Sequence, residues 1–206
     1  IELFRGNLIP GGIMGKGTLH GHEYSDSDLV RRCAGGDIRS QELLYRRYFS
    51  FAMSVCIRYA RDESEAMEIV NDSYMKVLDR IKDYDPSRPF KSWYGKILVN
   101  TAIDSYRRNL KNNDYISIDT IAETGEGEPE IETELSVNDI LTLYRYLPAN
   151  LKITFNLYET EGYSHDEIGA MMGVTASTSR ANLARAKKML RELYNKHIIS
   201  LRKGHE

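Results

Sequence analysis

Aromatic and basic side chains gather in one stretch, KDYDPSRPFKSWYGKILVNTAIDSYRRNLK, which covers residues 82–111. Tyr84 stands in a loop that two prolines stiffen, because proline fixes its own φ and restricts the residue before it. The following segment carries Trp93, the only tryptophan of the chain, and Asn100. An aromatic ring beside cations can stack an unpaired base while the cations hold the backbone. The stretch therefore predicts a platform for single-stranded nucleic acid.

A helix from Phe90 to about Lys111 is expected to position this platform. At about 100° per residue, its polar side chains line up between two apolar stripes. The stripes contain Phe90, Tyr94, Ile97 and Thr101 on one side and Val99, Ile103, Tyr106 and Leu110 on the other. The platform is predicted to comprise Tyr84, Arg88, Lys91, Trp93, Lys96, Asn100, Asp104, Arg107, Arg108 and Lys111. The alternative is that Trp93 and Tyr84 serve only in core and loop packing.

A second candidate site lies in the pair SHDEIGAMMG and TASTSRANLARAKKML. A capping box at Ser164–Glu167, a turn at Gly173 and a long basic helix are typical of a helix-turn-helix. Arginine can bind guanine and asparagine can bind adenine in the major groove, while further cations hold phosphates. The predicted contacts are Thr175, Ser177, Thr178, Arg180, Ala181, Asn182, Arg185, Lys187 and Lys188. The alternative is an α-hairpin with a solvated basic face.

We expect the elements that position both sites to form an all-α fold of two small helical domains joined by an acidic flexible linker. The first domain, residues 25–111, is expected to contain helices after Ser25 as far as Gly35-Gly36 and at 38–60, 64–81 and 90–111. The second, residues 137–197, is expected to contain helices at 137–147, from Pro148 to Glu161, from the capping box to the turn, and at 176–195. His165 is expected to be exposed at a helix start.

Charge is distributed unevenly along the chain of 206 residues, whose net charge is −2. Residues 112–136 contain eight acidic residues and no Lys or Arg, so the remainder of the chain carries about +6. This segment is predicted to be an extended linker, because its like charges repel one another. The glycine-rich start, residues 1–24, and the end, residues 198–206, are predicted to be tails, and Met14 is a candidate natural start.

Composition argues against several other classes of protein. No apolar run reaches the ~18–20 residues of a membrane span, and the first residues lack the charged-then-apolar order of a secretory signal. Membrane insertion is therefore not expected, and we expect a cytoplasmic location. Cys33 and Cys56 lack metal or disulfide spacing and are predicted to be small buried side chains. No Ser or Cys nucleophile has a histidine that the sequence places beside it, and the sequence contains no phosphate loop or metal-binding motif. We therefore expect no enzyme activity and no cofactor.

Four stretches in this order resemble the bacterial sigma factors of the extracytoplasmic-function class, in the sigma-70 superfamily. They are GDIRSQELLYRRY (36–48), SEAMEIVNDSYMKVLDRI (64–81), YDPSRPFKSWYGKILVNTAIDSYRR (84–108), and LPANLKITFNLYETEGYSHDEIGAMMGVTASTSRANLARAKKML (147–190). The resemblance covers about residues 25–194. It implies a sigma region 2-like domain, a sigma region 4-like domain and a role in promoter-specific transcription initiation.

The resemblance also implies partners for each part of the chain. The polar side of the 64–81 helix would bind the clamp-helix coiled coil of RNA polymerase core, through Glu65, Glu68, Asn71, Asp72, Lys76 and Asp79. Tyr84 would hold a flipped base of the minus-ten element, and Asn100 would contact the same single strand. The second domain would read the minus-thirty-five duplex and rest on the polymerase flap. The linker would thread toward the active centre, and an anti-sigma factor or other regulator would be a further partner.

The sequence departs from the commoner family pattern in its glycine-rich start and at Ser179, Asn182 and Ala184. Two other functions stay open at this point. One is a free-standing helix-turn-helix regulator that binds duplex operators and uses the first domain for sensing or dimerisation. The other is a bundle that serves chiefly as a protein-interaction adaptor. The 84–111 stretch favours the sigma factor, because an operator binder has no use for a single-strand platform.

Overall fold

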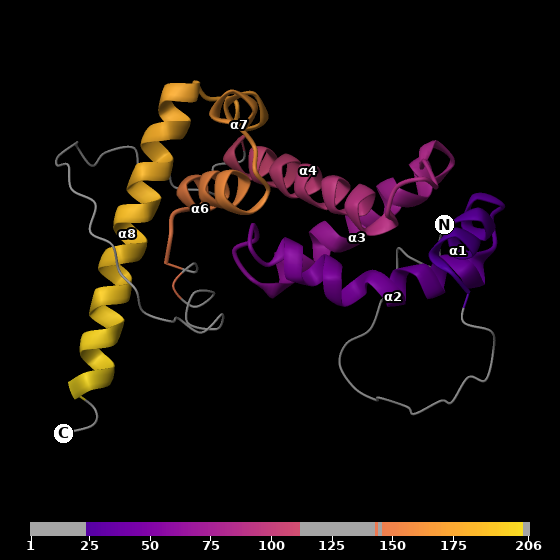
Figure 1. Ribbon diagram of the computed structural model, residues 1–206, viewed down its shortest axis with the longest axis horizontal. Helices are drawn as coiled ribbons and strands as arrows, with labels where there is room; N and C mark the ends of the chain where they lie inside the picture. Colours follow the sequence, from indigo (N-terminus) through magenta and orange to yellow (C-terminus); the bar gives the residue numbers. More distant parts are fainter. Residues whose placement is uncertain (1–23, 112–142, 144–145, 204–206) are drawn as a thin grey trace.

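The structure, a computed structural model, describes residues 24–111, 143 and 146–203. All regular structure within these residues is helical, which confirms the all-α class (Figure 1). The helices are α1 (Asp26–Ala34), α2 (Ile38–Cys56), α3 (Glu63–Arg80), α4 (Phe90–Lys111), α6 (Ala149–Phe155), α7 (His165–Met172) and α8 (Ala176–Lys203), with the short helices η2 (Ile81–Asp83) and η3 (Asn156–Thr160). The predicted linker 112–136, nearly all of the tail 1–24 and most of the helix predicted at 137–147 lie outside the described residues.

Helix caps predicted from the sequence are present at two helix starts. The hydroxyl of Ser25 accepts a hydrogen bond from the amide of Asp28 at 3.1 Å and begins α1. The hydroxyl of Ser164 accepts from the amide of Glu167 at 3.3 Å, while the Glu167 carboxylate accepts from the Ser164 amide at 2.8 Å. Gly173 ends α7 at φ 72°, a left-handed conformation that favours glycine. These contacts confirm the capping box and the turn.

Several helix ends differ from the sequence prediction. The helix predicted from Pro148 to Glu161 is α6 as far as Phe155 and continues as η3 to Thr160. Helix α2 ends at Cys56 rather than near Ala60, because the amides of Tyr59 and Ala60 both bond to the Cys56 carbonyl and tighten the chain into a turn. Pro148 precedes α6 as its N-cap instead of being its first residue. Helix α8 continues eight residues past the predicted end at Asn195, to Lys203.

The N-terminal bundle, α1 to α4, is packed around aromatic and aliphatic side chains. Leu44, Tyr74 and Leu98 from three of its helices are at most 2 % exposed. The rings of Tyr45 and Tyr74 meet edge to face at 5.0 Å between centroids, a favoured arrangement. Both predicted apolar stripes of α4 are buried except for Leu110, which lies in the last turn of α4 and is 37 % exposed.

The C-terminal domain, α6 to α8, packs directly against the N-terminal bundle. Ile153, Leu157, Ile168 and Met172 belong to the same hydrophobic cluster as the core of the bundle. Helix α7 contacts α4, and in Figure 1 α6 and α7 lie beside the end of α4. The two domains expected from the sequence therefore share one continuous apolar core in this conformation.

Candidate nucleic-acid interface

Tyr84 lies in the loop between η2 and α4, against the first turn of α4. Its ring centroid is 5.3 Å from that of Trp93 and 5.7 Å from that of Phe90. Its hydroxyl donates to the carbonyl of Arg88, which ties the ring to the proline-containing loop. Phe90 is buried, whereas Tyr84 and Trp93 are only partly buried and keep exposed ring surface. The loop and the first turn of α4 thus each present one partly exposed ring, and the two rings contact each other.

The outward strip of α4 begins next to these rings. Trp93, Lys96, Asn100, Asp104, Arg107 and Lys111 follow one another at steps of three or four residues, which keeps them on one side of the helix. Lys96, Asn100 and Lys111 are exposed, and Arg107 is half-buried. Lys91 lies outside the strip, with its ammonium 4.8 Å from the ring centroid of Phe51 in α2. The loop residue Arg88 is exposed and pairs with Asp85 at 3.6 Å.

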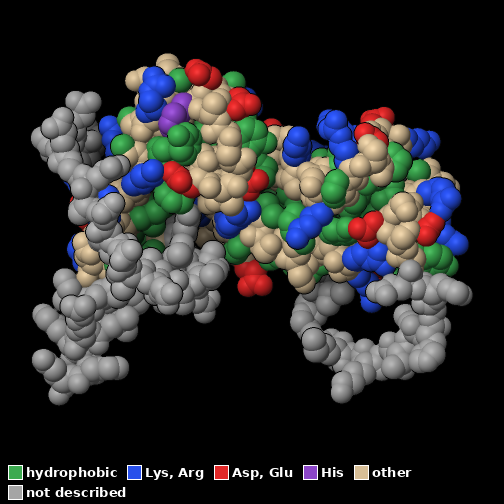
Figure 2. Space-filling model, in the orientation of Figure 1, with side chains coloured by type: hydrophobic (Ala, Val, Ile, Leu, Met, Phe, Trp, Pro, Cys, Tyr) green, Lys and Arg blue, Asp and Glu red, His purple; other side chains and the backbone are tan. Residues whose placement is uncertain are grey.

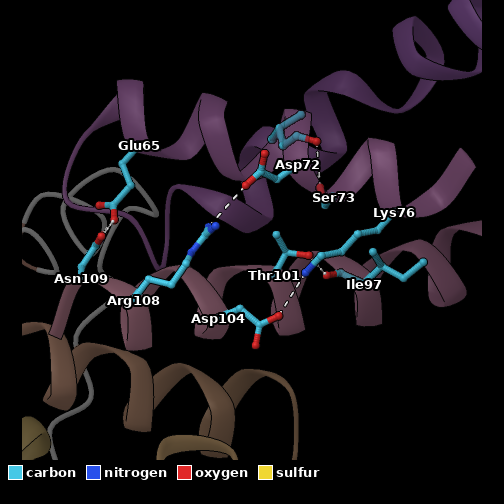
Figure 3. A network of polar contacts seen from close by, with 10 residues as sticks. Glu65, Asp72, Ser73, Lys76, Ile97, Thr101, Asp104, Arg108 and Asn109 are labelled. Atoms are coloured by element: carbon cyan, nitrogen blue, oxygen red, sulfur yellow. Dashed lines mark hydrogen bonds and ion pairs between the residues drawn. The ribbon is translucent and has the colours of Figure 1, made fainter. Parts of the chain in front are cut away.

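Ion pairs join Asp104 of this strip and the neighbouring Arg108 to the polar side of α3 (Figure 3). Lys76 lies 3.0 Å from Asp104, and Arg108 lies 3.3 Å from Asp72. All four side chains are at least 39 % exposed, so each pair contributes about 0–1 kcal/mol. They line a groove of about 520 Å³ between α3 and α4. The residues predicted for polymerase and for DNA therefore meet at one surface, the α3–α4 face, through weak contacts that a partner can replace.

Two residues predicted on the polymerase-binding side of α3 are engaged within the bundle. Glu65 is 6 % exposed and accepts hydrogen bonds from Arg61 Nε at 3.1 Å and from Asn109 Nδ2 at 2.8 Å. Asn71 is half-buried and accepts from the hydroxyl of Tyr45 at 2.9 Å. Glu68, Asp72 and Asp79 remain exposed. The burial of Glu65 does not fit its predicted place on a docking surface, because α4 covers this part of α3.

The second candidate site is a helix-turn-helix formed by α7 and the start of α8. A side-chain carbon on Gly169 would lie 2.8 Å from the carbonyl of Val174, so glycine allows the turn to pass close to α7. The hydroxyl of Thr175 accepts from the amide of Thr178 at 3.1 Å and begins α8. Of the predicted contacts, those that are exposed are Thr175, Ser177, Thr178, Arg180, Ala181, Arg185, Lys187 and Lys188. Lys187 pairs with Glu159 at 2.9 Å. Figure 2 shows Lys and Arg side chains on both domains, with Asp and Glu among them.

Three polar residues near this site are buried or half-buried, and for two of them, Asn182 and His165, this differs from the sequence prediction. Asn182 is 4 % exposed, which does not fit the predicted contact with a base edge. Ser179 is fully buried, and its hydroxyl lies 2.9 Å from Nδ1 of His165, so a polar group at this position has a partner. His165 is half-buried rather than exposed, and its ring stacks on Tyr158 at 4.5 Å. The neighbouring helix covers these positions, which the periodicity of α8 alone does not reveal.

Sequence reasoning also missed a set of polar contacts between the two domains. Lys152, Asn156 and Glu161 of the C-terminal domain bind Arg58, Tyr59 and Ala60, which follow α2. A signal for these contacts exists in the stretch LKITFNL, residues 151–157, where a lysine and an asparagine interrupt an apolar run. Polar groups in such a run are buried and therefore need partners.

Comparison with known families matches both domains. The chain matches Sigma-70 region 2 over residues 44–111 and Sigma-70, region 4, over residues 138–190. Together the two matches cover more than half of the chain. The first contains α3, α4 and the Tyr84 loop, and the second contains the helix-turn-helix.

Curated relatives align with the chain along most of its length. It is 25 % identical to the ECF RNA polymerase sigma-E factor of Haemophilus influenzae, over 82 % of this chain and 94 % of that protein. It is also 25 % identical to the RNA polymerase sigma-H factor of Pseudomonas aeruginosa, over 82 % of this chain and 93 % of that protein. A solved structure of the sigma factor RpoE in complex with the anti-sigma factor NepR from Bartonella quintana is 20 % identical, with a TM-score of 0.45, and the match covers 77 % of this chain and 98 % of that chain.

The two sigma-70 regions, in this order and joined in one chain, define a transcription initiation factor. The chain belongs to the sigma-70 superfamily, in the extracytoplasmic-function class of RNA polymerase sigma factors. The known members to which it is similar are sigma factors, which are not enzymes. Among the described residues, no helix has the length and apolar character needed to cross a lipid bilayer.

Proposed function

We propose that this sigma factor divides promoter recognition between the Tyr84 loop with α4, which holds the unpaired minus-ten strand, and α8, which reads the minus-thirty-five duplex. The observation that carries this proposal is the outward strip of α4, where Lys96, Asn100 and Lys111 are exposed beside Tyr84 and Trp93. Bases can stack on aromatic rings while cations follow the backbone. The match to region 2 over this segment favours this function over a free-standing operator binder.

Tyr84 is the proposed receiver of a flipped base. Unstacking a base costs a few kcal/mol, which a ready-made aromatic site offsets. Tyr84 donates a hydrogen bond to the Arg88 carbonyl and its ring contacts Trp93. These contacts limit the conformational freedom of the loop before a base binds. Less conformational entropy is then lost when the base docks. Asn100 is proposed to contact a base edge, while Lys96 and Lys111 hold phosphates on either side.

The exposed acidic part of α3 is the proposed contact with polymerase core. Glu68, Asp72 and Asp79 remain exposed there, and Asp72 is held only by the exposed pair with Arg108. The resemblance to the family assigns this surface to the clamp-helix coiled coil and the second domain to the flap. Glu65 is left out of the proposed contact because it is buried within the bundle.

In the second domain, Arg180 is the proposed base-reading residue. It is exposed in the first turns of α8, where a recognition helix contacts base edges, with Ser177 and Ala181 beside it. Arg185 and Lys188 are the proposed phosphate contacts. Asn182 is left out because of its burial. An anti-sigma factor or other regulator is proposed as a further partner on the family resemblance alone. The chain is proposed to act in the cytoplasm without enzymatic activity of its own.

Run-off transcription with purified core polymerase tests this function. The expected result is promoter-dependent product when the chain is added to core polymerase and none with core polymerase alone. The free chain should show little sequence-specific affinity for duplex DNA, because its two sites must act together on the polymerase. Tight operator-like binding by the free chain, unaffected by core polymerase, would contradict the proposal.

A further inference from the structure

Asp26, in the first turn of α1, joins this helix to α2 through two side chains. Its carboxylate accepts a hydrogen bond from the hydroxyl of Tyr48 and lies 2.8 Å from Nη1 of Arg47. Partial burial disfavours the charged form of Asp26, but the hydrogen bonds from Tyr48 and Arg47 outweigh this effect and lower its pKa. The carboxylate is therefore a charged acceptor at neutral pH and holds the Tyr48 hydroxyl in one direction.

The ring of Tyr48 packs against the rings that support Tyr84. Its centroid is 4.9 Å from that of Phe90, which is 2 % exposed. The centroid of Phe90 is in turn 5.7 Å from those of Tyr84 and Trp93. Protein interiors are close-packed, so a displacement of Tyr48 is passed to Phe90 and to the two rings beyond it. A series of ring contacts therefore connects the Asp26 carboxylate to the two partly exposed rings.

Helix α1 also lies close to the loop itself. It contacts η2, which ends directly before Tyr84. Partial burial and the negative charges of Asp26 and Asp85 raise the pKa of Tyr84, so the Asp26 charge lies within electrostatic reach of that ring. The pair of Arg47 with Asp26 is 32 % and 42 % exposed and contributes little on its own. The contact that orients a ring is the charge-assisted hydrogen bond from Tyr48.

Helix α1 lies outside the segment that matches the known family. The match to Sigma-70 region 2 covers residues 44–111, so it includes Tyr48 and the Tyr84 loop but not Asp26. The predicted contacts with DNA and with polymerase likewise begin at Glu65 and leave α1 out. The carboxylate that fixes Tyr48 is therefore supplied by a helix to which neither the match nor the predicted contacts assign a role.

We propose that Asp26 and Tyr48 position the ring that receives a flipped base of the minus-ten strand. The inference rests on the proposed role of Tyr84 in holding that base. The carboxylate fixes Tyr48, whose ring supports Phe90 and, through it, Tyr84. Both are positioning residues, because they act through Phe90 and do not themselves contact the DNA strand. Rings that are fixed before binding lose less conformational entropy when the base docks.

Promoter opening by the holoenzyme, followed with permanganate, tests this inference. Tyr48→Phe is the central variant, because it keeps the ring and removes only the hydroxyl. Tyr48→Phe and Asp26→Ala should each slow opening of a matched duplex promoter about 2- to 10-fold, since a side chain that is no longer fixed must be ordered on binding. Asp26→Asn keeps an oxygen that can accept from Tyr48 and should retain most of the wild-type rate.

Asp28→Ala is the matched control. It removes a carboxylate from the same turn of α1, but this carboxylate bonds to Ser25 and Arg31 of its own segment. The control should open the promoter at the wild-type rate. Slowing by Asp28→Ala to the same extent as by Asp26→Ala would assign the effect to α1 as a whole and overturn the inference.

A double-mutant cycle separates positioning from a general loss of stability. In the Tyr84→Ala background the ring that Tyr48 positions is gone, so Tyr48→Phe should slow opening no further. Equal slowing by Tyr48→Phe in both backgrounds would overturn the inference. A wild-type rate for Tyr48→Phe, where Tyr84→Ala alone is slow, would also overturn it and leave the proposed function intact. A wild-type rate for Tyr84→Ala itself would instead overturn the proposed role of the loop, and the inference with it.

Trp93 reports on the same rings in the free chain. It is the only tryptophan, and its ring centroid is 5.3 Å from that of Tyr84. Tyr48→Phe should increase acrylamide quenching of Trp93 fluorescence relative to the wild type and to Asp28→Ala, because rings that are less fixed admit the quencher more often. Circular dichroism checks that each variant keeps native helicity. Equal quenching in all three folded proteins would overturn the inference.

Discussion

The α3–α4 face and the interdomain contact, in which Lys152, Asn156 and Glu161 bind residues 58–60, both join helices through polar side chains. Water reaches the two regions to different extents. On the α3–α4 face, Lys76–Asp104 and Asp72–Arg108 are exposed pairs, which contribute little to stability. In the interdomain contact, Lys152 and Asn156 are buried, and each donates a hydrogen bond to a backbone carbonyl. Exposed pairs can be exchanged for partner contacts at low cost, whereas buried donors strongly favour one arrangement. The two surfaces thus differ in burial rather than in residue type.

The largest expected contrast comes from the same substitution in the two regions. Asn156→Ala removes a buried donor to the Arg58 carbonyl and should lower the free energy of unfolding by about 1–3 kcal/mol. Asn100→Ala changes an exposed residue of α4 and should stay within about 0.5 kcal/mol of the wild type. Urea unfolding followed by circular dichroism measures both. Equal losses would remove the distinction between the interdomain contact and the α4 strip.

A second comparison separates base reading from phosphate contact on α8. If Arg180 binds guanine through two hydrogen bonds, Arg180→Ala should cost roughly 1–3 kcal/mol on the cognate minus-thirty-five element. Lys188→Ala should weaken binding to cognate and scrambled DNA alike and reduce the salt dependence. Holoenzyme affinities for both duplexes at several salt concentrations provide the test. Parallel losses for the two variants on both duplexes would contradict the division of roles.

The exposed part of the α3–α4 face should tolerate change in the free chain but not in the complex. Glu68→Lys should leave helicity and unfolding nearly unchanged and weaken assembly with core polymerase several-fold, since an interface charge is reversed. Asp83→Lys, an exposed change in η2, is the matched control. Co-elution titrations with core polymerase measure the affinity. Unchanged co-elution of the Glu68 variant would reject the proposed polymerase contact.

The smallest expected effect is a pH dependence of stability that arises from Lys152 in the interdomain contact. Burial lowers the pKa of Lys152 below its ordinary value of 10.5, so between the two values the unfolded chain binds more protons than the folded chain. Its contribution to stability therefore rises with pH in that window and is flat below it. The raised pKa of Tyr59 acts in the opposite direction, so the comparison must be with Lys152→Met. Urea unfolding from pH 7 upward should show the wild type gaining stability relative to this variant, and parallel curves would contradict the assignment.

Local signals explain how much of this fold could be predicted. Ser25, the Ser164–Glu167 capping box and Gly173 act through neighbours a few residues away, and the structure confirms each of them. The bounds of α4 were also predicted, because the prolines before Phe90 cannot continue a helix and the apolar stripes end near Lys111. The sigma-70 family could be recognised because its motifs lie in these same local segments.

Burial between helices explains what could not be predicted. Periodicity shows which side of one helix is polar, but not whether another helix covers that side. Glu65 and Asn182 are polar residues on predicted outward faces, and both are buried by neighbouring helices. The interdomain contact joins Lys152 to Ala60, which are far apart in sequence, and no local pattern predicts such a pair. The base-contact roles of Tyr84, Asn100 and Arg180 remain predictions.

Permanganate footprinting of promoter opening tests the central claim, the single-strand platform of Tyr84 and α4, most directly. Tyr84→Ala and Asn100→Ala should both slow opening of a matched duplex promoter, by an amount equivalent to about 1–3 kcal/mol per lost base contact. On a template already melted at the minus-ten element, with its recognition bases intact, Tyr84→Ala should be largely rescued. Asn100→Ala should stay defective there because base readout is lost. Opening of the matched promoter by both variants at the wild-type rate would contradict the claim.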